Sequence, residues 1–303
     1  MRFVVALDGS PQASAGAQWV ATLPLSAVDE VLVTSIVQRP VLLGSWGYVH
    51  TPATAGLYAD VWEQAEHEAR RVVESGAAVC AESGSTVRTI VREGHPISEL
   101  TALVGEVGAD LVVVGPHGRG RLEAILLGSV SQALLHAMPT SVLVAREPVR
   151  APKRVLLATD GSTHSLAAAQ YLARIPLPTR ARIEVLAVVD GLRSRYAEHR
   201  AADLRDLVTL ERRRAIEIVD ATIKVLETGG RNGTASIRHG DAKREILAAA
   251  AEGDADLIVM GARGLGGFRG LILGSVSRAV SKAAPCSTLV VAHGAGASES
   301  GES

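Results

Sequence analysis

Aromatic residues are scarce in this chain of 303 residues, at 3%, so its cores have to be built from Val, Leu, Ile and Ala side chains. There are only two cysteines, Cys80 and Cys286, and their separation excludes a disulfide framework and a cysteine-based metal site. Neither sign of charge dominates, with 31 Lys and Arg against 32 Asp and Glu. The chain therefore has no basic field with which to hold nucleic acid.

Long apolar segments are also lacking. No run approaches the roughly 18 residues that a membrane-spanning helix needs. The opening segment, MRFVVALDGS, has an apolar run too short for a signal peptide, and Asp8 interrupts it. We therefore expect a cytoplasmic protein with no membrane insertion and no nucleic-acid partner. Hydrophobic residues still reach 47%, and the length suggests about two domains of ordinary size.

The sequence contains a duplication. FVVALDGS, which starts at Phe3, returns as VLLATDGS from Val155, at an offset of 152 residues. From Gly94 and Gly240 onward the offset is 146, so the second copy has lost six residues between its second and third strands. The small polar residues at the end of the chain predict disorder. The expected segments are domain 1 at residues 1–147, domain 2 at residues 152–293, and a disordered tail at residues 294–303.

Each copy alternates short β-branched runs with helical patterns, such as the apolar spacing of Val61, Ala65, Ala69 and Val72. This alternation predicts a parallel sheet covered on both faces, and right-handed crossovers make it doubly wound. In such sheets ligands bind beyond the carboxyl ends of the strands, where the strand order reverses. The strands expected in the first copy are Phe3–Leu7, Val31–Val37, Val87–Arg92, Leu111–Val114 and Val142–Ala145.

A glycine-rich motif follows the fourth strand of both copies. GPHGRGRLEAILLGSVS starts at Gly115 and GARGLGGFRGLILGSVS at Gly261, and both contain G-x-x-G, nine residues, then G-S. Glycine lets a ligand approach the backbone closely, and the N-terminus of the next helix offers unpaired N–H groups and a partial positive charge. One interpretation is a cradle for a phosphate chain. The other is ordinary helix capping by Gly and Ser, although recurrence in both copies favours the cradle.

An aspartate follows the first strand of each copy, Asp8 and Asp160, at the same edge of the sheet. Its carboxylate can accept a hydrogen bond from a ribose hydroxyl, or it can shape the turn and cap the next helix. Both alternatives stay open. His117 and Arg263 occupy equivalent loop positions, where each is either a phosphate ligand or a solvated side chain. His95 in the GHP segment is interpreted as a turn residue.

With these motifs the chain resembles the universal stress protein family, whose nucleotide-binding members carry G-x-x-G-x9-G-(S/T). The resemblance covers nearly the whole chain as two tandem domains. It implies an α/β fold of two flavodoxin-like (adenine nucleotide alpha hydrolase-like) doubly wound parallel sheets, each with strand order 3-2-1-4-5. One departure is the GDA segment at Gly240, where the first copy has the family's G-x-P as GHP at Gly94.

The resemblance also implies a nucleotide, ATP with or without Mg²⁺, at matching positions of both copies. The aspartates would hold the ribose, the ends of the first and second strands would line adenine, and the glycine loop would bind the phosphates. The implied binding residues are Ala6, Leu7, Asp8, Val37, Val114, Gly115, His117, Gly118, Gly128, Ser129 and Val130 in the first copy and Ala158, Thr159, Asp160, Val189, Met260, Gly261, Arg263, Gly264, Gly274, Ser275 and Val276 in the second.

The leading hypothesis is an ATP-binding regulator of the stress response. Efficient catalysis is disfavoured because the chain has no G-x-x-x-x-G-K-[ST] loop and no carboxylate pair near the motif to hold Mg²⁺. No catalytic residue or metal site is therefore assigned. A slow ATPase and a nucleotide-independent interaction module remain the alternatives.

Two further segments predict contacts. The last strands, Val142–Ala145 and Thr288–Val291, are apolar sheet edges that tend to be paired or covered. They predict an intramolecular pseudo-dimer of the two halves and leave a further homodimer open.

The stretch Gln38–Asp60 is longer than its counterpart, and its aromatic residues form either a lid or partner surface, or a loop packed on its own domain. Those residues are Trp46, Tyr48 and Tyr58.

Overall fold

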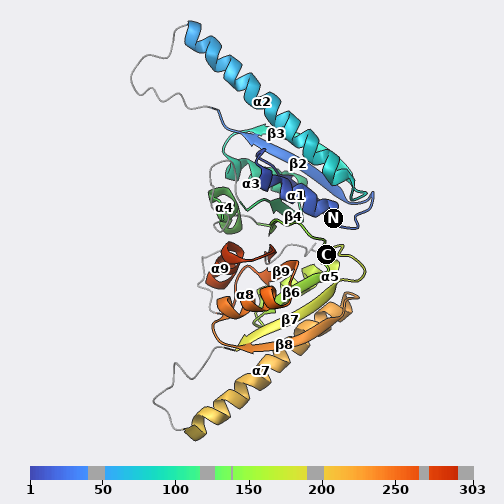
Figure 1. The fold of residues 1–303 in the computed structure, drawn as a ribbon, viewed down its shortest axis with the longest axis vertical. Helices are drawn as coiled ribbons and strands as arrows, with labels where there is room; N and C mark the ends of the chain where they lie inside the picture. Colours follow the sequence, from blue (N-terminus) through green and yellow to red (C-terminus); the bar gives the residue numbers. More distant parts are fainter. Residues whose placement is uncertain (40–51, 117–126, 138, 190–200, 266–272, 293–303) are drawn as a thin grey trace, which may run out of the picture.

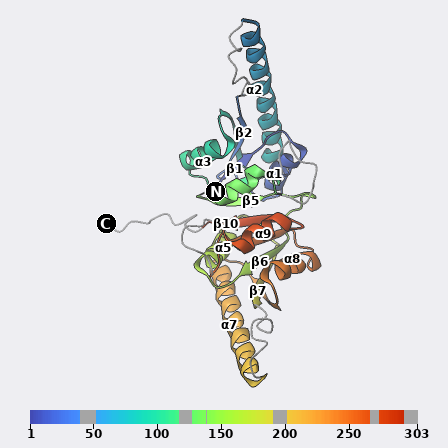
Figure 2. The same cartoon turned by 90° about the vertical axis from the view of Figure 1, so that its left-hand side faces the viewer.

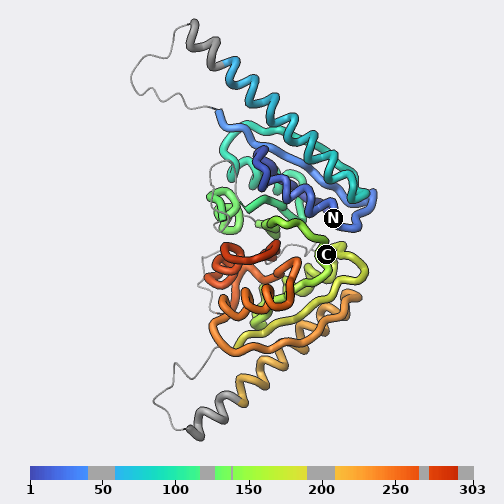
Figure 3. The backbone as a smooth tube through the Cα atoms, viewed as in Figure 1, coloured from blue at the N-terminus to red at the C-terminus, as the bar shows by residue number. Residues whose placement is uncertain are grey.

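Two copies of one α/β domain follow each other along the chain (Figure 1). The structure is a computed structural model that describes residues 1–39, 52–116, 127–137, 139–189, 201–265 and 273–292, with backbone only at 52–58 and 201–208. In the tube of Figure 3 the colours of the two copies do not intermix, so each half is one continuous stretch of chain.

The first half alternates strands and helices as its sequence pattern predicts. In chain order its elements are β1 (Arg2–Ala6), α1 (Pro11–Ala21), β2 (Glu30–Val37), α2 (Pro52–Ala81), β3 (Thr86–Glu93), α3 (Pro96–Val107), β4 (Leu111–Val114), α4 (Ser129–Ala137) and β5 (Ser141–Val144). All five expected strands are confirmed to within one residue at each end. Pro11 and Pro96 open α1 and α3, a position where the missing N–H costs nothing.

The second half repeats this order. Its elements are β6 (Arg154–Thr159), α5 (Thr163–Arg174), β7 (Arg182–Val189), α7 (Ala201–Thr228), β8 (Gly233–His239), α8 (Ala242–Glu252), β9 (Leu257–Gly261), α9 (Ser275–Ala283) and β10 (Ser287–Val291). The three consecutive arginines Arg212–Arg214 are exposed on α7.

Strands of the two halves form one ten-stranded sheet in the order β3-β2-β1-β4-β5-β10-β9-β6-β7-β8. Each half contributes the predicted order 3-2-1-4-5, with all pairs inside a half parallel. The halves meet where β10 pairs antiparallel with β5, Leu289 opposite Leu143. Figure 2 shows these two strands adjacent at the centre of the molecule. The predicted pairing of the apolar edge strands is therefore confirmed.

Helices cover both faces of the sheet, and each face has its own apolar core. Phe3, Val5 and Trp19 belong to the cluster under α1, α2, α5 and α7. Val4, Leu103 and Leu134 belong to the cluster under α3, α4, α8 and α9. Because successive residues of a strand point to opposite faces, β1 contributes to both clusters. The long helices α2 and α7 lie at opposite ends of an elongated molecule (Figure 1).

Hydrogen bonds between the halves supplement the strand pairing. The buried Tyr171 hydroxyl of α5 donates to the Asp110 carbonyl, at the start of β4, at 2.9 Å. The buried Arg146 guanidinium, just after β5, donates to the Ser281 and Lys282 carbonyls at 2.8 and 2.9 Å. These carbonyls lie near the end of α9, where a cation is favourable. The two halves therefore share polar contacts as well as a sheet.

One expectation about the first half was wrong in part. The stretch Gln38–Asp60 was interpreted as an insert, but its last part belongs to α2, which begins at Pro52. The second half has the corresponding long helix from Ala201, so the helix is a shared feature of both halves. Trp46, Tyr48, the Tyr58 side chain and the tail at 294–303 lie outside the described residues.

Candidate functional site

The candidate site lies at the carboxyl edge of each half, where the strand order reverses. β1 pairs with both β2 and β4, so the chain leaves the sheet in opposite directions after Ala6 and Val114. β6 has the same two neighbours in the second half, β7 and β9. The strands β2 and β7 both point to the left in Figure 1, toward the side of α4 and α9.

The first glycine of each motif packs against a helix. A Cβ atom on Gly115 would lie 2.4 Å from the Gln12 carbonyl oxygen and 2.8 Å from the Ala13 Cα in α1. On Gly261 it would lie 2.6 Å from the His164 carbonyl in α5. Glycine is therefore required here for close packing of strand end and helix, whatever its relation to a ligand. The sequence interpretation offered a ligand cradle or helix capping for the motif, and it did not foresee this contact with α1 and α5.

One backbone hydrogen bond in each half holds the two ends of the glycine loop together, with the same length in both halves. The Gly128 N–H donates to the Pro116 carbonyl, and the Gly274 N–H to the Ala262 carbonyl, each at 2.7 Å.

A buried serine adds a second link. The Ser131 hydroxyl donates to the Gly115 carbonyl at 2.7 Å, and the Ser277 hydroxyl to the Gly261 carbonyl at 2.8 Å. Both side chains are buried, at 5% exposure. Sequence reasoning gave no role to these two hydroxyls, although the repeated G-S-V-S could have identified them.

The loop ends at the exposed N-termini of α4 and α9. The first intrahelical bonds run from Gln132 N–H to the Gly128 carbonyl at 2.9 Å and from Arg278 N–H to the Gly274 carbonyl at 3.0 Å. The N–H groups of the three preceding residues in each helix have no intrahelical acceptor, because a helix leaves its first N–H groups unpaired. Ser129 and Ser275 are exposed beside them. The arrangement suits an anion, since the helix dipole adds a partial positive charge.

The aspartates after the first strands shape the adjoining turn. The Asp8 carboxylate accepts from the Ser10 N–H at 3.0 Å and the Ser10 hydroxyl at 2.7 Å. Ser10 in turn caps α1, accepting from the Ala13 N–H at 3.1 Å. Between them Gly9 has φ 80°, a left-handed conformation that glycine adopts without strain. The turn-shaping alternative is therefore confirmed for this residue, and it leaves a ribose contact untested.

In the second half the aspartate also contacts the glycine loop. One Asp160 oxygen accepts from the Ser162 N–H at 3.0 Å, and the other accepts from the Leu265 N–H at 2.8 Å. A Cβ atom on Gly264 would lie 2.4 Å from this second oxygen, so the loop can approach only because that residue is glycine. Asp160 and Gly264 of the predicted set are thus in contact, and the Arg263 carbonyl lies 3.4 Å from the Ser162 hydroxyl in the same turn. His117 and Gly118 of the first half lie outside the described residues.

The remaining predicted residues surround this edge, with side chains on different faces. Leu7 belongs to the core under α1 and α2, and Ala158 to the core on the other face. The Thr159 hydroxyl turns inward and lies 3.0 Å from the Thr222 hydroxyl of α7. The carbonyls of Val37 and Val189 already accept the Gly94 and Gly240 N–H groups, at 3.0 and 2.9 Å. Val114 and Met260 are buried near the ends of β4 and β9.

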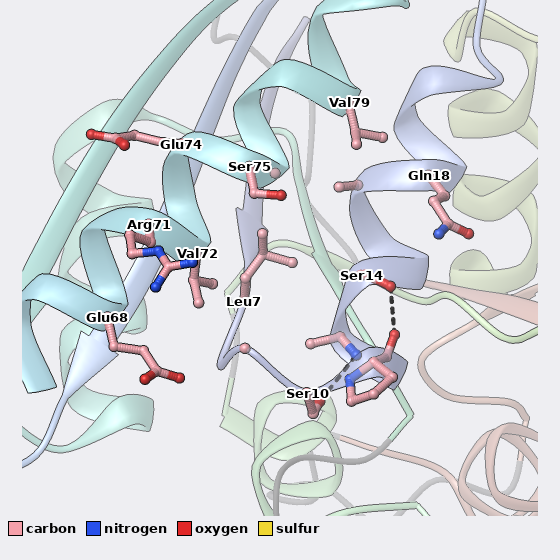
Figure 4. Close-up of a pocket in the computed structure, with 15 residues that line it drawn as sticks. Leu7, Ser10, Ser14, Gln18, Glu68, Arg71, Val72, Glu74, Ser75 and Val79 are labelled. Atoms are coloured by element: carbon pink, nitrogen blue, oxygen red, sulfur yellow. Dashed lines mark hydrogen bonds between the residues drawn. The ribbon is translucent and has the colours of Figure 1, made fainter.

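A cavity of about 630 Å³ opens between α1 and α2 on the face away from α4. Figure 4 shows Leu7 beneath it, Ser75 and Val79 on α2, and Ser14 on α1. It shares the turn after β1 with the candidate site, but none of its lining residues belongs to the glycine loop. The cavity was not predicted, since it depends on how two helices pack.

Within the described ranges, no three His, Cys, Asp or Glu side chains come together to form a metal site. In the same part of the chain, no helix combines the length and apolarity that crossing a membrane requires.

Fold and site together define a tandem α/β protein in which a glycine loop closes onto a helix N-terminus at the switch point of each half. The model of the universal stress protein family matches residues 1–146 and 152–292. The chain therefore belongs to the universal stress protein family.

Two relatives that match over nearly their whole length support this assignment, and one solved structure shows the same fold over nearly the whole chain. A universal stress protein of Mycolicibacterium smegmatis is 30% identical over 95% of this chain and 96% of its own length. One from Mycobacterium tuberculosis strain H37Rv is 29% identical over 95% of each chain. The crystal structure of a universal stress protein from Archaeoglobus fulgidus matches with a TM-score of 0.67 at 22% identity, covering 97% of this chain and 98% of that one.

Proposed function

We propose that the chain is a cytoplasmic, ATP-binding regulator of the stress response, with one nucleotide at the carboxyl edge of each half. The observation that supports this best is the repeated cradle. In both halves the same two hydrogen bonds close the glycine loop and leave the helix N-terminus exposed beside it. A phosphate chain is a ligand that such an N-terminus favours, because N–H donors and the helix dipole act together.

The other parts of the nucleotide would lie along the same edge. Asp8 and Asp160 stand where a ribose would follow the phosphates, directly after β1 and β6. Asp160 already accepts two N–H groups, but a carboxylate has about four acceptor sites, so a ribose hydroxyl adds to them. Val37 and Val189, at the ends of β2 and β7, would offer main-chain groups to adenine.

The chemistry of this site favours a regulatory role over catalysis. The motif contains no lysine, and Mg²⁺ would arrive with the nucleotide phosphates. In the second half the Asp160 carboxylate and the Leu265 N–H join the turn after β6 to the loop before α9. A nucleotide at this junction would bind one arrangement of the two segments more tightly than another. The ratio of its two affinities would set how far the equilibrium between these arrangements shifts. The arrangement it favours would set which partner binds.

Equilibrium binding of ATP to single-site variants tests the proposal. Asp8→Ala and Asp160→Ala should each weaken one site by roughly tenfold to a hundredfold, since a hydrogen bond to a charged group contributes about 1.5–3 kcal/mol. Ser129→Ala and Ser275→Ala should do less, because each removes one hydroxyl and leaves the helix N–H groups in place. Arg212→Ala, on the exposed face of α7, is the matched control and should bind like the parent. If both aspartate variants bind ATP with the affinity of the parent, the two aspartates shape the turns and do not contact the nucleotide.

Release of phosphate from ATP by the same proteins distinguishes a regulator from an enzyme. A regulator holds ATP with little or no phosphate release. Turnover that is fast and is lost in the aspartate or serine variants would replace the proposal with an ATPase. Properly folded protein that binds no nucleotide would instead indicate an interaction module.

A further inference from the structure

A second concave site lies at the opposite edge of the second half. A pocket of about 650 Å³ forms at the amino ends of β6 and β7, against the segment that links the two halves. Its cationic side chains come from two separate parts of the chain and converge on one space. They are Arg150, Lys153 and Arg154 from the linker and β6, and Arg180 and Arg182 from the start of β7.

Carboxylates neutralise only part of this charge. Asp254 pairs with Arg150 at 2.9 Å and also with Arg154. The buried Asp256 accepts from the Arg154 N–H at 2.9 Å and the Lys153 N–H at 3.2 Å, and its carboxylate also lies 3.9 Å from the Arg150 and 4.0 Å from the Arg154 guanidinium. Among the described residues the structure shows no ion pair to the side chains of Lys153, Arg180 or Arg182. Three cationic side chains around one pocket therefore remain without an acidic partner in those ranges.

The amino edge of the first half is the equivalent surface, and there the charges at the matching register position are balanced. There Arg2 is the register neighbour of Glu30, and the two side chains form an ion pair at 3.4 Å. At the same register position of the second half, Arg154 is the neighbour of Arg182. Like charges on adjacent strands are destabilising. The second half thus places two like charges at a register position where the first half has an ion pair.

Arg180 shows the same contrast. Its counterpart at the 152-residue offset is Val28, which is 85% exposed in the first half. The amino edge of the first half also neutralises its own terminus, because the Met1 ammonium pairs with Asp29 at 2.6 Å. The convergence of positive charge is therefore specific to one copy of a duplicated surface and does not follow from the fold.

We propose that this pocket binds a compact inorganic oligophosphate, an anion with at least two linked phosphate groups and no nucleoside attached. Guanidinium groups present planar forks of donors that match phosphate oxygens, and a strongly charged anion would relieve the repulsion between Arg154 and Arg182. The number of unpaired cations, three, suits a multiply charged anion better than a single carboxylate. The pocket is distinct from the carboxyl edge, since none of its lining residues lies in a glycine loop.

The test uses inorganic tripolyphosphate as the ligand. The pocket variant carries, in the second half, the residues that the first half has at the equivalent positions. Arg180→Val combined with Arg182→Glu recreates the Val28 and Glu30 positions, where the chain already tolerates these residues and forms an ion pair. We therefore expect the double variant to fold, with a melting temperature at least equal to the parent's. Its matched control is Arg212→Val with Arg213→Glu, the same change of charge on the exposed face of α7.

Tripolyphosphate should bind the parent and the α7 control alike, and it should bind the pocket variant at least about tenfold more weakly at this site. Its affinity for the parent should fall as salt rises, as expected of exposed charges. ATP binding at the carboxyl edges should be equal in all three proteins, so loss of the pocket leaves the proposed function untouched. Equal tripolyphosphate binding by pocket variant and control would overturn the proposal. Citrate binding as tight as tripolyphosphate would contradict the assignment to phosphate.

Discussion

In the first half Leu7 and Gly76 face each other between β1 and α2, whereas the equivalent residues of the second half are Thr159 and Thr222, whose hydroxyls lie 3.0 Å apart. The first arrangement borders a cavity of about 630 Å³. In the second, Ile218 stands so close to the turn after β6 that a Cβ atom on Gly161 would lie 2.8 Å from it. The packing of the long helix on the turn therefore differs between two copies of one fold.

At the carboxyl edges, in contrast, the two halves have nearly the same geometry. The loop-closing bonds from Gly128 and Gly274 are both 2.7 Å long, and those from Ser131 and Ser277 differ by only 0.1 Å, at 2.7 and 2.8 Å. Two copies that have diverged in helix packing and in the charge of their amino edges have kept this one geometry. The two halves thus share this local geometry at the carboxyl edge, where the nucleotide sites are proposed, and they differ in the packing of the long helix and in the charge of the amino edge.

The largest expected effect concerns the shared geometry itself. Gly115→Ala and Gly261→Ala should each lower the free energy of unfolding by about 1–3 kcal/mol or more, because the added Cβ would meet helix backbone that cannot move aside. Thermal and urea unfolding measure this. Gly105→Ala is the matched control, since nothing lies within 4 Å of the new atom in α3, and it should be neutral or slightly stabilising. Parent-like stability of both edge variants would show that the close packing is not required.

The next effect breaks the contrast between the two long helices. Gly76→Thr should destabilise the first half by about 1–3 kcal/mol, because its Cβ would lie 2.2 Å from the Leu7 side chain. Adding Leu7→Thr should recover part of the loss, since the pair then resembles Thr159 and Thr222. A double-mutant cycle measured by urea unfolding should give a coupling of roughly 0.5–3 kcal/mol. Strict additivity would mean that the two positions do not act as a unit.

A smaller effect concerns the contact between the halves. Tyr171→Phe should cost about 0.5–1.5 kcal/mol, because it removes the hydrogen bond to the Asp110 carbonyl and keeps the ring. Trp19 occupies the equivalent place in the first half, where its indole N–H is buried with no hydrogen-bond partner among the described residues. Trp19→Phe is therefore a comparison in which no such bond is lost, and its cost should come from volume alone. A Tyr171→Phe variant as stable as the parent would show that this hydrogen bond does not contribute to stability.

The same tyrosine gives a pH dependence. Burial raises the pKa of Tyr171 above its ordinary value. The folded state therefore resists ionisation more than the unfolded state does. Its contribution to stability is complete below the unfolded pKa of about 10 and is lost as pH rises above it. Unfolding free energies between pH 9 and 11 should fall more steeply for the parent than for Tyr171→Phe; equal slopes would contradict the expectation.

Local patterns predicted more of the fold than of the site. The strands and the pairing of β5 with β10 followed from β-branched runs and apolar edges, which are properties of short segments. The start of α2 at Pro52 was missed because clear helical spacing begins only near Val61. The glycine loop was located correctly, but the contacts of Gly115 with α1 and of Asp160 with Leu265 were not foreseen. Such contacts, like both pockets, depend on segments far apart in the sequence, and spacing alone does not show which side chains meet.

Calorimetric titration of nucleotide-free protein with Mg-ATP, for the parent and for Gly274→Val, tests the central claim most directly. The parent should bind two ATP molecules per chain. A Cβ atom on Gly274 would lie 3.3 Å from the Ala262 carbonyl oxygen, and the two further carbons of valine would crowd the cradle, so the variant should bind one. Melting temperatures of both proteins show whether each is folded. A folded parent that binds none, or a folded variant that still binds two, would contradict a nucleotide site at the carboxyl edge of each half.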